Sequence, residues 1–375
     1  MKNIVLIDNE PFTKRRDQLF YISRLRGDGF DVQVWDVSTF FSTGSKFPDI
    51  IVADYVIKIE NIEHLKVLLS KVDIPSTFFI VEASMSDDSY PIYKVLKEKH
   101  CFIARFDFFS NSNIPLAKGT SRKTDCIQKL YLNFRAVCHK VRNIFHSIRW
   151  YGIKYDVFLS PRRIKGVTGG INHPDYNDFL LNNQTPLLNY DYIVFCDQYF
   201  PLHPEVKNVA PNINVEKYYA QMRKLFDVVE KTSGMPVVIA SHPKAEYEGC
   251  EFGNRNMIKY QTMNLVMNSK KVIFHTSNSL SFSVLANKEI LCVYTDDFVN
   301  SNIGEYQLLL GIKNALKINI YNIDQVDLKE IKFEKINKEQ RKSYIYDYLT
   351  TKGTKDLDNY YIIKSLIEKS VYLKR

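Results

Sequence analysis

The chain has 375 residues, of which 45% are hydrophobic and 25% are charged, a composition that is typical of a folded globular protein long enough for two domains. Its longest apolar runs have the length of a strand, so the sequence predicts no transmembrane helix, and the opening residues 1–8 predict a core strand and not a secretory signal. Lysine and arginine exceed aspartate and glutamate by 51 − 42 = 9, which favours an anionic partner such as a phosphorylated substrate, an acidic lipid or nucleic acid.

The N-terminal half alternates predicted strands and helices. Apolar runs predict strands at 3–7, 31–35, 50–53, 77–81 and 102–106, and helical periodicity predicts helices at 13–25, 62–71 and 90–99. Alternation at this spacing indicates βαβ units and a parallel sheet.

A long helix is predicted from 124 to 149, beginning at the capping pair Thr124-Asp125. Apolar residues recur along it at helical spacing, and lysine and arginine occupy the other faces. We interpret it as a core helix with a solvated basic side. The alternative is a surface helix on an anionic membrane, because basic amphipathic helices bind such surfaces.

A second alternating block begins near Tyr155, with predicted strands at 155–159, 190–195, 236–240, 272–275 and 289–294 and helices at 215–231, 262–269 and 279–287. The sequence therefore predicts an α/β fold in two Rossmann-like domains, 1–150 and 151–335. The lysine- and tyrosine-rich stretch 336–375 predicts C-terminal helices that pack back on the N-terminal domain.

The first polar strand end of this block is Asp197, which follows the apolar run Tyr192–Cys196. A carboxylate in this position can act as a general base, because partial burial raises its pKa towards a useful range. Capping of the following loop is the alternative. Gln198, Tyr199 and His203 come next, and they either shape an acceptor pocket or form an aromatic corner.

The second strand end is the segment Ser241-His242-Pro243-Lys244. Because proline keeps the residue before it extended, His242 can be held at the mouth of the strand. A bound phosphate would keep its imidazole protonated near neutral pH. We interpret the segment as part of an anion site, and an ordinary loop histidine is the alternative.

The third strand end is the segment His275-Thr276-Ser277-Asn278-Ser279, which opens a predicted helix. Hydroxyl groups and free N–H groups at a helix start can hold phosphate oxygens, and ordinary capping by the serines is compatible with this. Glu305, further along, can hydrogen-bond a ribose. Since the carboxyl ends of parallel strands open onto one crevice, the segments at 242 and 277 are expected to converge.

Several enzyme classes lack support in the sequence. It contains no GxxxxGK[ST] loop, no GxGxxG after the first strand, no HExxH and no GxSxG. Asp356-Leu357-Asp358 matches the DxD metal motif of sugar transferases, but no apolar strand precedes it, so we interpret it as a chance match. The six cysteines include no CxxC pair and are typical of buried thiols in a cytoplasmic protein. We expect neither a metal site nor a cofactor.

The motifs resemble those of bacterial GT-B glycosyltransferases that use CMP-activated acidic sugars, a group that includes sialyltransferases and the transferases of Kdo or pseudaminic-type sugars in capsule and lipopolysaccharide synthesis. His242-Pro243 resembles the His-Pro pair of that group. Ser277 and Ser279 resemble its serine motif, although Asn278 separates them. The matched positions span 190–300.

This resemblance implies a GT-B architecture with an interdomain cleft, a CMP-sugar donor and a glycan or glycolipid acceptor. In that architecture the N-terminal domain 1–150 would bind the acceptor and the C-terminal domain 151–335 would bind the nucleotide sugar. Asp197 would be the acidic residue that takes the acceptor proton, although Gln198 stands where the group has a second acid. His242 and Lys244, with the donors around 277–279, would stabilise the departing phosphate as the sugar passes through an oxocarbenium-like state.

Other functions remain open at this point. Teichoic-acid glycerophosphotransferases, which use CDP-glycerol, have a similar layout of motifs, and a UDP-sugar transferase of the same architecture is a further alternative. A non-catalytic protein that binds nucleic acid or phosphate belongs to a different class. Since the basic residues are dispersed and no RRM, KH, zinc-finger or helix-turn-helix signature is present, no nucleic-acid partner is expected.

Overall fold

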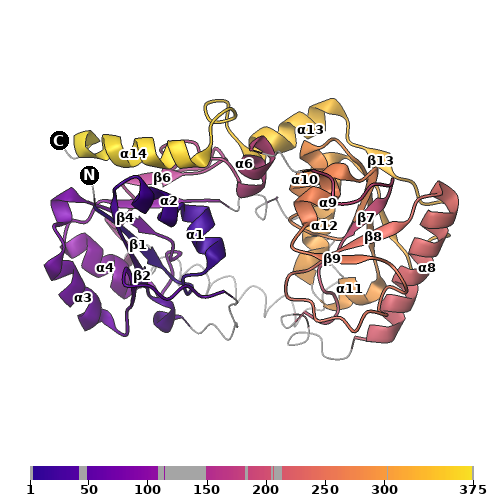
Figure 1. The fold of residues 1–375 in the computed structure, drawn as a ribbon, viewed down its shortest axis with the longest axis horizontal. Coiled ribbons are helices and arrows are strands. Elements are labelled where there is room, and N and C mark those ends of the chain that lie inside the picture. The colour runs from indigo at the N-terminus through magenta and orange to yellow at the C-terminus, as the bar shows by residue number, and fades with distance from the viewer. Residues whose placement is uncertain are drawn as a thin grey trace, which may run out of the picture. The chain divides into compact units, whose positions relative to one another are not determined.

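The computed structural model describes residues 3–41, 49–108, 114, 149–181, 185–203, 206, 213–301 and 303–373 (Figure 1). The predicted helix at 124–149 lies outside the described residues, except for its last residue. The chain forms two compact units. Unit 1 contains Met1–Phe108, Thr120–Ile171 and Asp356–Arg375, and unit 2 contains Phe109–Gly119 and Asn172–Lys355.

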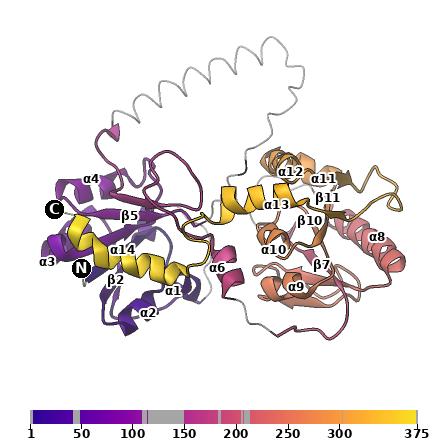
Figure 2. The same cartoon turned by 90° about the horizontal axis from the view of Figure 1, so that it is seen from above.

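Unit 1 is built on a parallel six-stranded sheet with the strand order β3-β2-β1-β4-β5-β6 (Figure 2). The strands are β1 (Asn3–Asp8), β2 (Asp31–Asp36), β3 (Val56–Lys58), β4 (Thr77–Val81), β5 (Ile103–Phe106) and β6 (Val157–Leu159). This is the strand order of the doubly wound Rossmann fold, so the predicted fold class is confirmed for this unit.

Helices cover both faces of this sheet, because successive side chains of a strand point to opposite faces. Ile4 and Leu6 belong to one core, and Val5 and Ile7 belong to the other. The first core is completed by residues of α1 (Lys14–Phe20), α2 (Ile22–Gly27) and α14 (Asn359–Leu373), and the second by residues of α3 (Ile62–Lys71) and α4 (Tyr90–Glu98).

Unit 2 has the sheet order β12-β11-β10-β7-β8-β9, with β13 antiparallel to β11. Counted from β7, this order is again that of the Rossmann fold. The strands are β7 (Ile193–Cys196), β8 (Val237–Ser241), β9 (Met257–Lys259), β10 (Lys271–Phe274), β11 (Glu289–Tyr294), β12 (Ile320–Asn322) and β13 (Glu334–Lys335). The helices are α6 (Pro174–Leu180), α8 (Val215–Ser233), α9 (Thr262–Asn268), α10 (Leu280–Leu285), α11 (Asp296–Ser301), α12 (Ile303–Leu316) and α13 (Lys338–Tyr344), followed by a π-helix at Ile345–Leu349.

Two predicted elements of unit 1 differ from the structure. The predicted helix 13–25 is two helices, because Tyr21 between them has a left-handed backbone with φ 56°. The predicted strand 50–53 is wrong. Ile50 and Val52 are 53% and 93% exposed, and β2 pairs instead with Val56–Lys58 after the intervening turn.

The chain leaves unit 1 later than the expected boundary at 150. The strand β6, which the sequence analysis assigns to the second block, pairs with β5 in the sheet of unit 1, and the second segment of this unit ends at Ile171. The C-terminal stretch divides between the units: α13 belongs to unit 2 and α14 to unit 1. Among the described residues, no helix combines the length and the apolar character that a membrane span requires.

Candidate functional site

The candidate site lies at the carboxyl ends of the strands in unit 2. The chain continues from β7 to β8 on one side and returns as β10 on the other, so the strand order reverses between β7 and β10. Ligands of doubly wound sheets bind outside the carboxyl ends at such a switch point. Cys196 pairs in register with Ala240 of β8 and with Phe274 of β10. The ends of β8 and β10 are therefore about 10 Å apart, two strand spacings.

Two consecutive residues after β7 tie the loops on either side together. The Asp197 carboxylate accepts a hydrogen bond from the His242 backbone N–H at 3.0 Å. The Gln198 side chain accepts from the Thr276 backbone N–H at 3.0 Å and donates to the Thr276 hydroxyl at 3.0 Å. The structure thus brings the three predicted strand ends together at one edge of the sheet.

Asp197 is 5% exposed and is heavily hydrogen-bonded. Its Oδ1 accepts from the Tyr199 N–H at 2.8 Å, and its Oδ2 accepts from the His242 N–H and from the Tyr247 hydroxyl at 2.7 Å. Burial raises the pKa of Asp197, and these hydrogen bonds act in the opposite direction. The contacts are those of an anchor for the His242 turn, and the predicted role as a base stays a prediction.

His242 is held with one ring nitrogen engaged by its own turn. Its Nδ1 accepts a hydrogen bond from the Lys244 backbone N–H at 3.2 Å, so Nδ1 carries no proton and Nε2 is the donor. The Tyr199 ring lies parallel to the imidazole within 6°, with centroids 6.5 Å apart, and the His203 ring meets it edge-on at 5.4 Å.

The other residues of this segment differ in exposure. Pro243 and Lys244 are exposed, whereas Ser241 is 2% exposed. The Ser241 hydroxyl finds no hydrogen-bond partner among the described residues.

The third segment is also fixed by internal contacts. Thr276 is 4% exposed, and its hydroxyl donates to Glu305 of α12 at 2.5 Å. The Ser277 hydroxyl accepts from the Ser279 N–H at 3.2 Å, so it closes the turn before α10. Asn278 is exposed. Glu305, predicted as a separate ribose contact, therefore lies at the same strand end as Thr276.

His275 precedes this segment but is a buried structural residue. It is 0% exposed, its Nδ1 donates to the Val293 carbonyl at 2.5 Å, and its Nε2 accepts from the Tyr218 hydroxyl at 2.9 Å. Burial lowers the pKa of His275 to about 4. The ring stays neutral and ties β10 to β11 and α8.

Two tyrosines of the site are absent from the sequence-based prediction. Tyr247 binds Asp197, as described above. Tyr260, directly after β9, is 70% exposed, has a left-handed backbone with φ 61° and donates to the Pro243 carbonyl at 3.4 Å. A positive φ is unusual for a bulky residue and occurs preferentially at functional sites. No spacing or composition signal marks either residue.

The DxD match has a structural explanation. Asp358 accepts from the Tyr360 N–H at 3.0 Å at the start of α14 and lies 3.3 Å from the Arg24 guanidinium. Within the described parts of the chain, no group of three or more metal-ligating side chains is arranged to hold an ion.

Comparison with known proteins shows the fold. No protein-family model matches the sequence, and no curated protein is similar to it in sequence. The solved structure of the wall teichoic acid polymerase TagF is similar with a TM-score of 0.51 at 11% identity, covering 100% of this chain and 90% of that chain. The likeness spans both units and confirms the predicted fold class, two Rossmann-like α/β units of the GT-B type.

Two further structures are similar over their whole length. MurG of Acinetobacter baumannii has a TM-score of 0.44 at 8% identity, covering 98% of this chain and 100% of that chain. Arabidopsis thaliana UGT89C1 complexed with UDP-L-rhamnose has a TM-score of 0.45 at 12% identity, covering 98% and 99%.

Proposed function

We propose that the chain is a metal-independent glycosyltransferase that moves an acidic sugar of the sialic, Kdo or pseudaminic type from a CMP-sugar to a surface-polysaccharide or lipopolysaccharide acceptor. The observation that carries the proposal is the linkage of the His242 and Thr276 loops through Asp197 and Gln198 at the switch point of unit 2. The fold likeness to the wall teichoic acid polymerase TagF is compatible with this proposal, although a likeness of fold does not identify the nucleotide.

The proposed stabilisation of the departing phosphate depends on the hydrogen-bond donors at the carboxyl edge of the unit 2 sheet. A phosphate outside β7 and β10 would meet the Nε2–H of His242 and the exposed ammonium of Lys244. As the bond from sugar to phosphate breaks, negative charge grows on the departing phosphate. Fixed donors aimed at such charge contribute about 3 to 4 kcal/mol each at other active sites.

Tyr260 supports a nucleotide at this edge. Its exposed ring lies one strand beyond His242, and its hydroxyl contacts the His242 turn through Pro243. A nucleobase stacked on an aromatic side chain gains about 1 to 3 kcal/mol. The cytosine preference itself rests on the resemblance of the His-Pro and serine motifs to those of CMP-sugar enzymes.

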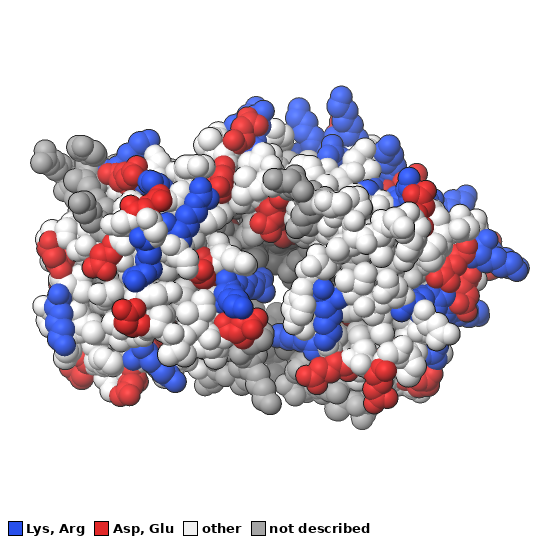
Figure 3. All heavy atoms as spheres, in the orientation of Figure 1, with Lys and Arg blue, Asp and Glu red and all other residues white. Residues whose placement is uncertain are grey.

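A second candidate function is transfer from CDP-glycerol. The likeness to the wall teichoic acid polymerase TagF favours it over a UDP-sugar transferase. A nucleic-acid binder is less well supported, because basic and acidic side chains are interspersed over the face shown in Figure 3.

The first experiment is a nucleotide screen by thermal shift with CMP, CDP, UDP, GMP and a short oligonucleotide. Stabilisation by CMP or CDP above the others supports a cytidine-dependent transferase, and the His242→Ala variant should lose it. Turnover assays with CMP-sugars and with CDP-glycerol then separate the two candidates. A salt-sensitive preference for the oligonucleotide would contradict both.

We propose that the protein is cytoplasmic. Contact of the basic segment 124–149 with an anionic membrane is the alternative to a core helix with a solvated basic side. Vesicles with and without phosphatidylserine test this contact. Equal sedimentation with both would remove it.

A further inference from the structure

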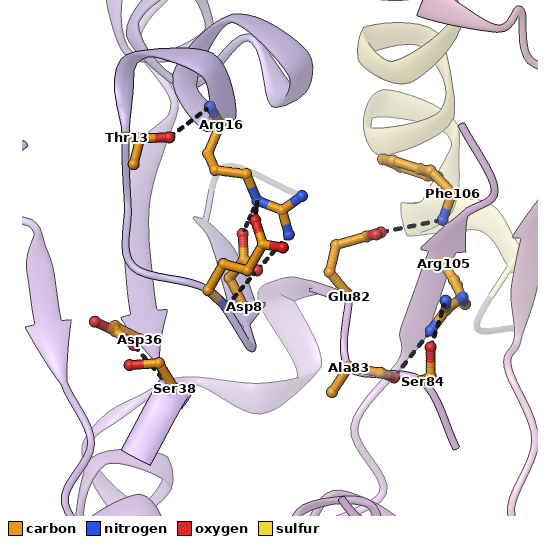
Figure 4. A network of polar contacts seen from close by, with 11 residues as sticks. Asp8, Thr13, Arg16, Asp36, Ser38, Glu82, Ala83, Ser84, Arg105 and Phe106 are labelled. Carbon is orange, nitrogen blue, oxygen red and sulfur yellow. Dashed lines mark hydrogen bonds and ion pairs between the residues drawn. The ribbon is translucent and has the colours of Figure 1, made fainter. Parts of the chain in front are cut away.

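The two units hold the polar groups at their switch points in different ways. In unit 1 the strand order reverses between β1 and β4, and Asp8 at the end of β1 forms an ion pair with Arg16 of α1 (Figure 4). In unit 2 the side chains of Gln198, Thr276 and Glu305 form a chain of hydrogen bonds instead. This hydrogen-bond chain has a direction, and the direction restricts which residues can form it.

The hydrogen-bond chain connects three elements of unit 2. Gln198 follows β7, Thr276 follows β10, and Glu305 lies in the first turn of α12. The Gln198 side chain accepts from the Thr276 backbone N–H and donates to the Thr276 hydroxyl, both at 3.0 Å. The same hydroxyl donates to Glu305 Oε2 at 2.5 Å. Thr276, at the centre, is 4% exposed, so water has little access to its hydroxyl.

The chemistry of the groups fixes which atom donates at each step. A backbone N–H can only donate, so the Gln198 atom that faces the Thr276 N–H is the amide oxygen, and the amide nitrogen faces the hydroxyl. The hydroxyl has a single proton. Glu305 takes it, because a carboxylate accepts and the Gln198 oxygen is farther from the hydroxyl, at 3.3 Å. The hydrogen bonds therefore run from Gln198 through Thr276 to Glu305.

This direction explains the residue type at position 198. A carboxylate there would donate no proton to the Thr276 hydroxyl, and two carboxylates would compete for the one hydroxyl proton. The glycosyltransferases that the motifs resemble have a second acid where this chain has Gln198. In this chain Glu305 already occupies the hydroxyl proton, so an amide is the side chain that fits.

The same bonds determine what Thr276 can do. Its N–H is donated to Gln198 and its O–H is donated to Glu305, so neither hydrogen is left for a phosphate. What Thr276 supplies is a fixed start for the turn before α10, which is closed by the hydrogen bond from the Ser279 N–H to the Ser277 hydroxyl at 3.2 Å.

We propose that Gln198 and Glu305 are a matched pair of positioning residues. Acting through Thr276, they hold the turn before α10 in the arrangement that binds the phosphate of the donor nucleotide. The inference rests on the proposed transferase function. It gives both residues a role that neither a ribose contact nor an acceptor pocket requires, because each residue type depends on the other.

The test is a double-mutant cycle with Gln198→Glu, Glu305→Gln and the double variant, in which calorimetric titration measures the affinities for CMP and CDP. Gln198→Glu should weaken nucleotide binding by about tenfold, because the Thr276 hydroxyl loses its donor. Glu305→Gln should also weaken binding, since it removes the charged acceptor.

In the double variant the hydrogen bonds can run in reverse. The new amide at 305 donates to the Thr276 hydroxyl, and the hydroxyl donates to the new carboxylate at 198. We therefore expect the double variant to bind within about threefold of Glu305→Gln alone, so that the second substitution rescues the first. Gln18→Glu, at an exposed position of α1 in unit 1, adds the same charge elsewhere and should bind as the wild type does.

The unfolding midpoints of all variants separate positioning from stability alone. If the midpoints show the rescue and the nucleotide affinities do not change, the hydrogen-bond chain is merely structural and the inference is overturned. Additive losses of affinity in the double variant also overturn it, and both results leave the transferase function intact. If the wild type binds neither CMP nor CDP, the proposed function fails and this inference fails with it.

Discussion

The two histidines that follow β8 and β10 have the same side chain and opposite surroundings. His242 has one nitrogen bound by its own turn, and its ring is partly exposed. His275 is 0% exposed, with both nitrogens bound to groups of the unit 2 interior. His242 therefore lies at the strand end where the ligand is proposed to bind, whereas His275 acts on stability.

His275 makes the stability of unit 2 dependent on pH. Its pKa of about 4 in the folded chain lies below the ordinary value of about 6.5 in the unfolded chain, so the unfolded state binds more protons between these values. The free energy of unfolding should therefore fall by about 3 kcal/mol as the pH drops from 6.5 to 4.

Urea unfolding at several pH values, followed by circular dichroism, measures this dependence. His275→Gln should reduce the slope between pH 6.5 and 4, and the control His64→Gln should leave it unchanged. An equal slope in both variants would show that other groups dominate.

Asp197 is either an anchor for the His242 turn or the catalytic base, and these two roles predict different results for the Asp197→Asn variant. In Asp197→Asn, the amide NH₂ must face donors that now contact a carboxylate oxygen. Leaving one buried N–H without an acceptor costs about 1 to 3 kcal/mol. An anchor therefore predicts a lower unfolding midpoint and a CMP affinity that is weaker by about tenfold, the equivalent of 1.4 kcal/mol.

Calorimetric titration with CMP checks the prediction, and Tyr247→Phe, which removes one donor to the same oxygen, serves as the milder companion. Loss of turnover with normal CMP affinity and stability would instead restore the role of a base.

At the residue level, sequence alone locates the strand ends but not the contacts made there. The apolar runs before Asp197, His242 and His275 predict where polar residues emerge. Whether each side chain is buried depends on neighbours distant in sequence, such as Tyr247 for Asp197 and Tyr218 for His275.

At the level of elements, α14 is the clearest long-range contribution. Tyr360, Ile363 and Ile367 are at most 2% exposed and complete a core that is otherwise formed by the first half of the chain. Figures 1 and 2 show the helix along the side of unit 1 that carries α1 and α2. Polar contacts reinforce it, including Arg24 stacked 3.6 Å above the Tyr360 ring.

Truncation of Ile363 tests this contribution. Ile363→Ala should lower the free energy of unfolding of unit 1 by about 2 to 5 kcal/mol, because it leaves a cavity in a closed core. Glu368→Ala, at an exposed position of the same helix, is the matched control. Both tryptophans, Trp35 and Trp150, belong to unit 1, so tryptophan fluorescence reports its unfolding. Equal midpoints for the two variants would contradict the packing role.

Helices and strands whose apolar residues recur regularly were predictable from the sequence. Helices that are broken along their length were not. The structure has α3 at Ile62–Lys71 and β4 at Thr77–Val81, matching the expected ranges, since one apolar face determines each. The break at Tyr21 depends on its left-handed backbone, for which a tyrosine gives no sequence signal. The run at 50–53, in which Ile50 and Val52 are exposed, shows that apolar residues alone do not select the edge strand.

At the scale of the whole molecule, one strand order occurs twice. Each unit has its own cores on the two faces of its sheet, and each places polar residues at its switch point. The alternation of strands and helices predicted this organisation. The sequence analysis expected all of 336–375 to pack on the N-terminal domain, but only 356–375 belongs to unit 1. The helical pattern of this stretch does not show where it divides, because that depends on which core has space for α14.

The separate cores lead to a prediction for nucleotide binding. A ligand that binds only the folded state stabilises it by about 2.7 kcal/mol at 100 times its Kd. The proposed nucleotide contacts lie in unit 2, whereas both tryptophans lie in unit 1. CMP should therefore shift the unfolding curve measured by circular dichroism and leave the curve measured by tryptophan fluorescence in place. Because His242 supplies the proposed donor, His242→Ala should abolish the shift, and a parallel shift of both curves would contradict a nucleotide site confined to unit 2.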